Sequence, residues 1–238
     1  MTETLPLDAM ALATRVLFFD IEASGLHEAS VPVELGWAWI TREAGDGPAL
    51  RVKTEAMLIR PLRAWMEDPK TWDPAAERIH GISRRELVDS GRPAGEVALA
   101  FDQARAGKSI VSDTGHDGVD ARWLRKLCQA ARKPRYPAVA RVDPSHFWWP
   151  VQESGLGPDG FEAVRQIAPQ ASHRAAEDAA RPAWILAVMA TLADMASNGG
   201  KAAQVAALGR LPRDLVDLLG DRLPKAPNDW DYRPIPGI

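Results

Sequence analysis

The segment RVLFFDIEASGL, residues 15–26, constrains this chain more than any other. It opens with an apolar run at residues 16–19, which is typical of a strand covered on both faces at the centre of an α/β sheet. Asp20 and Glu22 follow, with one apolar residue between them. Because side chains two apart on a strand share a face, we expect both carboxylates to point the same way where this strand ends.

Neighbouring carboxylates repel each other unless a cation neutralises them or one of them holds a proton. Ligand sets made only of oxygen atoms select hard ions such as Mg²⁺ or Mn²⁺, with Ca²⁺ less suitable, over Zn²⁺. The pair could also be two solvated acids that end an exposed strand. An isolated Asp-x-Glu does not separate these interpretations, so the decision depends on the other motifs.

Length and charge narrow the class of protein. The 238 residues suffice for one α/β domain with a small appendage. A net charge of −3 argues against a broad phosphate-binding surface, although a metal can supply positive charge locally. Cys128 is the single cysteine, which excludes an internal disulfide and a thiolate zinc cluster. Neither a secretory signal nor a membrane-spanning run is readable, so we expect a cytoplasmic protein without a membrane partner.

Turn residues and hydrophobic patterns predict the order of the elements. Two strands should follow the first one in an antiparallel meander, at residues 31–40 and 50–60. The later elements are expected in the order helix 73–82, helix 83–90, helix 92–107, strand 109–113, helix 119–131, strand 138–143, helix 161–168 and helix 174–196. Pro182 should kink the last helix or move its start to a later residue.

The composition changes after the last long helix. SNGG, residues 197–200, is typical of a linker, and a weakly amphipathic pair of helices is expected at residues 201–220 before a Pro-rich tail. We therefore predict a main domain at residues 10–196 and an extension at residues 197–238.

Four separated motifs that contain acids or histidines occur in a fixed order: DIEASGL with Asp20 and Glu22, RIHGIS with His80, DGVDARWL with Asp120, and HRAAEDAA with His173 and Asp178. Together they resemble the DEDDh family of 3′-5′ exonucleases, which includes proofreading exonuclease subunits and ribonuclease T. The resemblance spans residues 15–190. It implies an α/β, ribonuclease-H-like fold with a mixed five-stranded sheet flanked by helices, to which the composition adds the C-terminal helical extension.

The resemblance also assigns roles to the acids. Asp20, Glu22, Asp120 and Asp178 match the family's four metal ligands, which hold two Mg²⁺ or Mn²⁺ ions. Two such ions, about 3.5 to 4 Å apart, clamp the attacking and departing oxygens of a phosphoryl displacement. His173 matches the general base. Five residues on a helix correspond to about 500°, so His173 and Asp178 would not share a face, and we expect His173 on the loop before the helix.

The third metal ligand departs from the family pattern. Val119 precedes Asp120 where Phe is usual, and His116 stands where Asn is common. Asp117 is therefore an alternative third ligand, and Asp113 is a more distant one.

The resemblance places the end of the substrate near the first motif. Ser24 replaces the family's usual Thr and keeps its hydroxyl, the backbone at Gly25 meets the terminal nucleotide, and Leu26 wedges against a base. His80 would lie near the substrate's end. Plain packing for Leu26 and a structural role at a helix end for His80 are the alternatives.

The sequence thus predicts a metal-dependent 3′-5′ exonuclease that releases nucleoside 5′-monophosphates from single-stranded DNA or RNA, or from a 3′ overhang. A catalytically silent binding or scaffolding module of the same fold is one alternative, and an oligoribonuclease-like enzyme on short RNA is the other. The choice between DNA and RNA stays open, because it depends on the shape of the pocket. The sequence is equally compatible with a monomer and a dimer.

Overall fold

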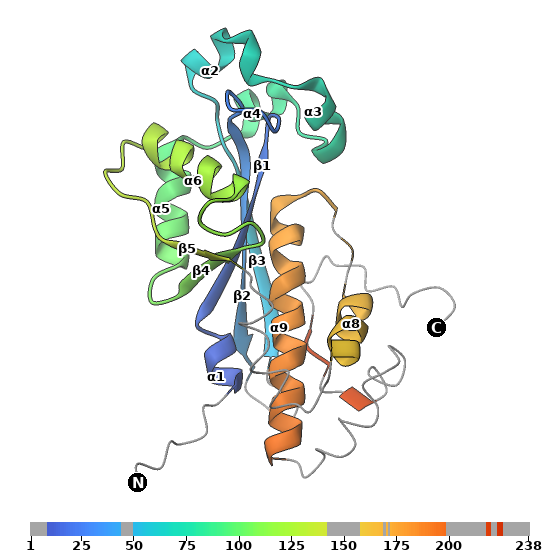
Figure 1. The fold of residues 1–238 in the computed structure, drawn as a ribbon. Helices are drawn as coiled ribbons and strands as arrows, with labels where there is room; N and C mark the ends of the chain where they lie inside the picture. The colour runs from blue at the N-terminus through green and yellow to red at the C-terminus, as the bar shows by residue number, and fades with distance from the viewer. Residues whose placement is uncertain are drawn as a thin grey trace.

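A five-stranded mixed sheet forms the centre of the computed structural model, which describes residues 9–43, 50–141, 158–168, 170, 172–198, 218–219 and 223–225 (Figure 1). The strands are β1 (Val16–Ala23), β2 (Pro32–Arg42), β3 (Leu50–Leu58), β4 (Ser109–Ser112) and β5 (Val139–Arg141), in the spatial order β3-β2-β1-β4-β5. The first three strands pair antiparallel, whereas β4 and β5 add parallel to β1. The predicted mixed five-stranded sheet and its initial meander are confirmed.

Strand β1 is central because both of its faces are covered. Leu17, Phe19 and Ile21 pack on one face against the layer that contains α5 (Ala94–Ala104) and α6 (Val119–Ala130). Phe18 packs on the other face, against α9 (Ala175–Asn198). The strand continues to Ala23, beyond the predicted apolar run, so Asp20 and Glu22 lie within it.

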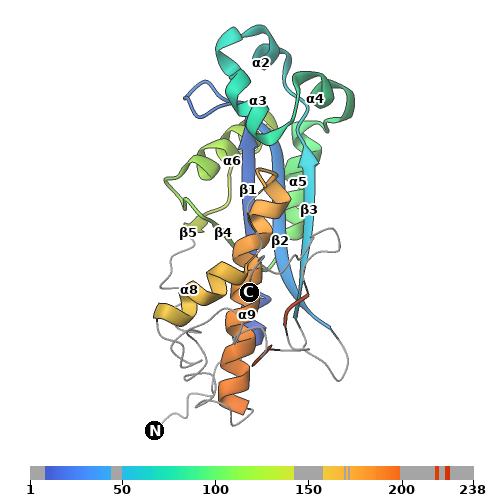
Figure 2. The ribbon, with the colours of Figure 1, turned by 90° about the vertical axis from the view of Figure 1, so that its right-hand side faces the viewer.

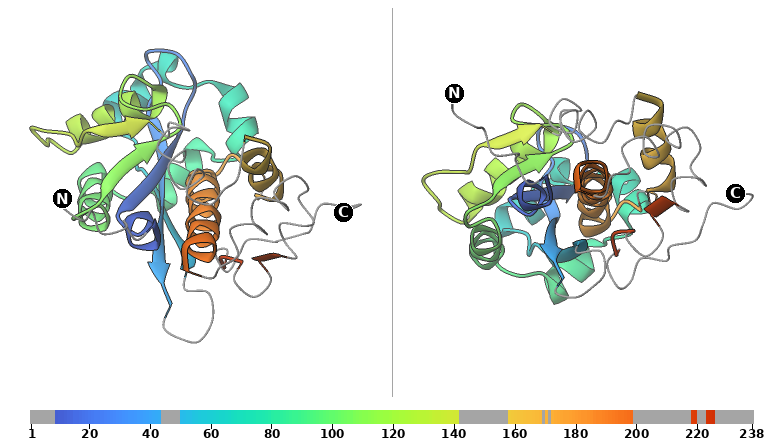
Figure 3. Two further views of the ribbon diagram at one scale, coloured as in Figure 1. Left: turned by 60° about the horizontal axis from the view of Figure 1, so that its bottom comes forward. Right: turned by 90° about the horizontal axis from the view of Figure 1, so that it is seen from below.

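Helices cover the sheet on both faces. Figures 2 and 3 show α9 along one face and α5 on the opposite one. Trp184 of α9 is fully buried against the sheet, and Phe101 of α5 packs edge-on against Phe19 on the other side. The short helices α1 (Ala9–Ala13) and α8 (Pro158–Ile167) lie beside α9. Among the described residues, none of the helices has the length and apolar character that crossing a bilayer demands.

Short helices form a cap beyond the end of β1, at the top of Figure 1. They are α2 (Arg63–Glu67), the 3₁₀ helix η1 (Pro69–Thr71), α3 (Pro74–His80) and α4 (Arg84–Ser90). Ser83 of the sequence's capping-box pattern caps helix α4, since its hydroxyl accepts from the Glu86 N–H at 3.1 Å. The Asp73 N–H donates to the Ser24 carbonyl at 2.7 Å, which ties the cap to the turn after β1.

Helix α9 begins at Ala175, close to the predicted residue 174, so the alternative of a later start caused by Pro182 is wrong. Pro182 lies inside the helix and cannot donate to the carbonyl of Asp178. Packing of α9 on the sheet outweighs this loss, because most of its side chains between Ala179 and Met195 are buried. Asp178 therefore belongs to the first turn of α9.

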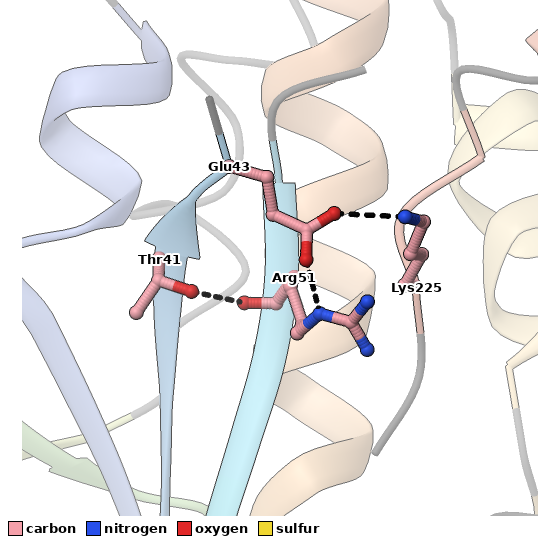
Figure 4. A network of polar contacts seen from close by, with 4 residues as sticks. All are labelled: Thr41, Glu43, Arg51 and Lys225. Carbon is pink, nitrogen blue, oxygen red and sulfur yellow. Dashed lines mark hydrogen bonds and ion pairs between the residues drawn. The ribbon is translucent and has the colours of Figure 1, made fainter. Parts of the chain in front are cut away.

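A short piece of the C-terminal extension covers the edge of β3. The Val52 N–H donates to the Lys225 carbonyl at 3.0 Å, and the buried Trp184 indole donates to the Pro224 carbonyl at 3.1 Å. Figure 4 shows Glu43 accepting from both Arg51 and Lys225. This contact shields an otherwise open strand edge. Most of the helix pair predicted at residues 201–220 lies outside the described residues.

A chain that ends at residue 217 should unfold more easily than one that ends at residue 225. The shorter chain loses the cover of β3 and the buried side chain of Leu219, which is 2% exposed. Loss of one fully buried Leu and of the hydrogen bond to Trp184 should lower the free energy of unfolding by at least about 2 kcal/mol. Urea denaturation of both chains measures the difference, and equal midpoints would show that the segment contributes nothing to stability.

Candidate metal centre and active site

Three carboxylates from two distant elements meet on the α9 face of β1. Carboxylate oxygens of Asp20, Glu22 and Asp178 all lie within 4.8 Å of one another. The alternation along β1 directs its two acids to the same side as Phe18, and the first turn of α9 presents Asp178 to that side. The cluster thus follows directly from strand periodicity and from the packing of α9 on the sheet.

The electrostatics of this cluster are unfavourable for bare carboxylates. Burial, followed by the charges of Asp120 and Glu22, raises the pKa of Asp20 well above its ordinary value. Burial and the charge of Asp178 raise the pKa of Glu22 from 4.5 to about 7. Burial is also the main reason why the pKa of Asp178 is raised. A hard divalent cation would neutralise this repulsion, and carboxylate oxygens are the ligands that such a cation prefers.

Asp120 lies at the start of α6, close enough for its charge to raise the pKa of Asp20, but it is not part of the 4.8 Å group. It is only 4% exposed. Asp113 is exposed after β4, and its charge raises the pKa of both Asp20 and Asp120. Asp117 is exposed on the loop before α6.

Two residues to which the sequence motifs assign no role, Thr114 and Gly118, orient Asp120. The Thr114 hydroxyl donates to the Asp120 carboxylate at 2.7 Å. Gly118, the residue before α6, makes this possible, because a Cβ there would lie 2.1 Å from the Cβ of Thr114. The pattern TGHDG at residues 114–118 signals a tight loop, but the contact itself depends on tertiary structure.

His173 lies outside the helix, as its spacing from Asp178 predicts. It is exposed on the loop before α9 and has a backbone φ of 59°, which is costly for a residue with a side chain. The Ser172 N–H donates to the Asp178 carboxylate at 3.0 Å. The charge of His173 lowers the pKa of Asp178, so the imidazole lies near that carboxylate. The loop and the first turn of α9 are thus joined through Asp178.

The turn after β1 presents one apolar side chain to solvent. Leu26 is 77% exposed, so the alternative of plain packing is wrong. Ser24 is fully buried, and its hydroxyl donates to the Thr71 carbonyl and accepts from the Val31 N–H at 2.9 Å. Gly25 is closely packed, since a Cβ there would lie 2.9 Å from the Ser30 hydroxyl. Ser24 therefore shapes this turn from inside the protein.

His80 is buried at the end of α3. Its Nδ1 accepts from the Ile82 N–H at 3.0 Å, and burial lowers its pKa. A neutral imidazole that closes a helix end agrees with the structural alternative for this residue.

Sequence reasoning missed Glu34 and Arg174. Glu34 lies opposite Glu22 in the β1–β2 register, is 1% exposed, and pairs with Arg174 at 2.6 Å. Its signal in the sequence is a single acid inside the apolar strand VPVELGWAWI. Arg174 follows His173 directly in the chain.

Neither a protein-family model nor a curated protein matches the chain. Solved structures of exonuclease I are similar to it. One has a TM-score of 0.49 and 17% identity, covering 81% of this chain and 45% of that one. Exonuclease I from E. coli in complex with a dA16 oligonucleotide has a TM-score of 0.47 and 16% identity, covering 86% of this chain and 42% of that one. Exonuclease I from Methylocaldum szegediense has a TM-score of 0.47 and 16% identity, covering 86% of this chain and 45% of that one.

This chain therefore spans less than half the length of those exonuclease I structures. At such identities and TM-scores, no reaction, substrate or ligand transfers from them to this chain.

Proposed function

We propose that this protein is a metal-dependent 3′-5′ exonuclease of the DEDDh type, which releases nucleoside 5′-monophosphates from the 3′ end of single-stranded DNA or RNA. The observation that carries the proposal is the convergence of Asp20, Glu22 and Asp178 within 4.8 Å on one face of β1. Burial raises the pKa of all three acids, and the charges of Glu22 and Asp178 raise the pKa of Asp20 further, so bringing these carboxylates together opposes folding. Acids that oppose folding and still converge indicate a functional site.

The residues present fit a pair of Mg²⁺ or Mn²⁺ ions. Carboxylate oxygens are the ligands that these ions prefer, and the cluster supplies the negative charge they need. The four acids that would hold them are Asp20, Glu22, Asp120 and Asp178. When bound, the ions supply Lewis-acid stabilisation of the charge that develops on the phosphodiester.

His173 is the residue that we assign to proton transfer. His173 is exposed on the loop that contacts Asp178, where a neutral imidazole can accept the proton of the attacking water. The water oxygen bonds to the terminal phosphorus as the bond from phosphorus to the 3′ oxygen of the preceding nucleotide breaks. That 3′ oxygen takes a proton from solvent, and a nucleoside 5′-monophosphate leaves.

Leu26 is the side chain that we assign to contact with the terminal base. Replacement by Ala should raise KM for an oligonucleotide about 5- to 10-fold, equivalent to roughly 1 kcal/mol of lost apolar contact, and leave kcat nearly unchanged. Leu99→Ala is the matched control, because Leu99 is 54% exposed on α5. Steady-state kinetics on a labelled oligonucleotide measure both, and equal KM values in the two variants would refute the contact.

Digestion of 5′-labelled single-stranded DNA, RNA and duplexes with either end recessed tests the proposed function. With Mg²⁺ or Mn²⁺, the label should remain on products that shorten stepwise from the 3′ end, and nucleoside 5′-monophosphates should appear. EDTA should stop the reaction. A silent binding module would retain the oligonucleotides without shortening them, and an oligoribonuclease-like enzyme would shorten only RNAs of a few nucleotides.

A further inference from the structure

Glu34 is a buried acid whose hydrogen bonds, within the part of the chain that the structure describes, all reach the start of α9. Its Oε1 accepts from Nη2 of Arg174 at 2.6 Å. Its Oε2 accepts from Nε of Arg174 at 3.1 Å and from the Ala175 N–H at 3.0 Å. A forked ion pair combined with a backbone bond fixes orientation as well as distance. One carboxylate therefore holds two consecutive residues at the point where α9 begins.

Gly36 brings the same part of α9 into backbone contact with the sheet. A Cβ at this position would lie 2.1 Å from the Ala176 nitrogen and 2.2 Å from the Ala175 carbonyl carbon. Gly36 is two residues after Glu34 on β2, so both face α9. The acid and the glycine together set how closely and at which point α9 meets the sheet.

This contact lies directly beside the proposed catalytic residues. His173 precedes Arg174 in the chain, and Asp178 follows Ala175 within one helical turn. On the sheet, Glu34 is the register partner of Glu22. The start of α9 is thus attached to β2 at the same level at which β1 carries its acids.

We propose that Glu34 is a positioning residue, which fixes the start of α9 and thereby holds His173 and Asp178 in front of the acids of β1. Stability alone does not require a buried ion pair here, since well-packed apolar residues often stabilise a fold equally well. A further negative charge beside Glu22 is also electrostatically unfavourable unless Arg174 neutralises it. This inference rests on the proposed function.

Glu34→Gln tests the inference, with Asp102→Asn as the matched control. Asp102 also joins elements through an ion pair, because it accepts from Lys133 and from Arg105, away from α9. Both substitutions remove one charge and keep the size of the side chain. Glu34→Gln should lower kcat about 10- to 100-fold and weaken Mn²⁺ binding, because losing a residue that orients metal ligands has effects of this size. Its KM should stay within about twofold of the parent. Asp102→Asn should keep the kcat and the Mn²⁺ affinity of the parent.

Arg174→Lys provides a second test that does not depend on the folding of the Gln variant. This substitution keeps the positive charge but loses the two-nitrogen contact of the guanidinium with Glu34. The Arg174 side chain is 46% exposed. It should lower kcat and Mn²⁺ affinity in the same direction as Glu34→Gln. The double variant should be no slower than Glu34→Gln alone, because both substitutions remove one interaction.

Calorimetric Mn²⁺ titration separates the two levels of failure. A parent protein that neither binds Mn²⁺ nor shortens oligonucleotides would refute the proposed function itself. The other outcome is a parent that binds Mn²⁺, with Glu34→Gln and Arg174→Lys variants whose kcat and Mn²⁺ affinity equal those of Asp102→Asn. That result would overturn only the positioning role of Glu34.

Discussion

Replacement of Asp20 by Asn is expected to abolish metal-dependent hydrolysis and leave the protein folded. Burial and then the charges of the neighbouring acids raise the pKa of Asp20, so the substitution removes a buried charge and relieves repulsion at the centre of the cluster. It also removes a proposed anionic metal ligand from the site where Asp20, Glu22 and Asp178 meet. We expect a loss of kcat on the order of a thousandfold or more, equivalent to about 4 kcal/mol of transition-state stabilisation. Single-turnover digestion of a labelled oligonucleotide measures the loss.

Asp117→Asn is the control for this substitution. Asp117 is exposed on the loop before α6, and its replacement should leave the rate close to that of the parent. Asp120→Asn should lose kcat as Asp20→Asn does, because Asp120 is buried beside the cluster. Loss of activity in Asp117→Asn with full activity in Asp120→Asn would assign the third ligand to Asp117. Parent-like digestion by Asp20→Asn would contradict the proposed mechanism as a whole.

Without divalent cations, the acid cluster should make the protein less stable as the pH rises from about 4.5 to about 7. The pKa of Glu22 is raised from 4.5 to about 7 in the folded protein. Between these values the folded state binds more protons than the unfolded state, so the free energy of unfolding falls with increasing pH. Glu22 alone contributes a loss of up to about 3 kcal/mol. The raised pKa values of Asp20 and Asp178 act in the same direction.

Urea denaturation at pH 5 and pH 7.5, with EDTA or with Mn²⁺, measures this effect. Glu22→Gln is the matched variant, and the stability of the parent should fall more steeply with pH than that of the variant. Mn²⁺ should restore the stability of the parent at pH 7.5 and do little at pH 5, where protons already occupy the carboxylates. Equal slopes for parent and variant, or equal stabilisation by Mn²⁺ at both pH values, would contradict the electrostatic account.

The local features of the site could be predicted from the sequence because they depend on periodicity. Alternation along a strand places Asp20 and Glu22 on one face, and the structure shows both on the α9 side of β1. The spacing of His173 and Asp178 is incompatible with one helix face, and His173 lies before the helix. The Ser83 cap likewise follows from a local pattern.

The remaining features depend on contacts between distant residues. Glu34 is visible as an acid in an apolar strand, but its partner Arg174 lies 140 residues away. The cover of β3 by Lys225 uses backbone hydrogen bonds, which no side-chain pattern reports. The short helices α2 and η1 were not predicted, although η1 has a local signal, because the Asp68 side chain accepts from the Lys70 N–H at 2.9 Å. The helix at residues 174–196 could be predicted from its pattern, but the effect of Pro182 on its start could not, because burial of the helix outweighs the cost of the proline.

Anomalous diffraction from crystals grown with Mn²⁺ tests most directly whether these acids form a cation site. We expect a Mn²⁺ peak in contact with carboxylate oxygens of Asp20, Glu22 and Asp178, at roughly 2.1 Å. The peak should be absent from Asp20→Asn crystals grown under the same conditions. A saturating Mn²⁺ concentration that leaves no peak at these three side chains, or places it at exposed acids elsewhere, would contradict the account.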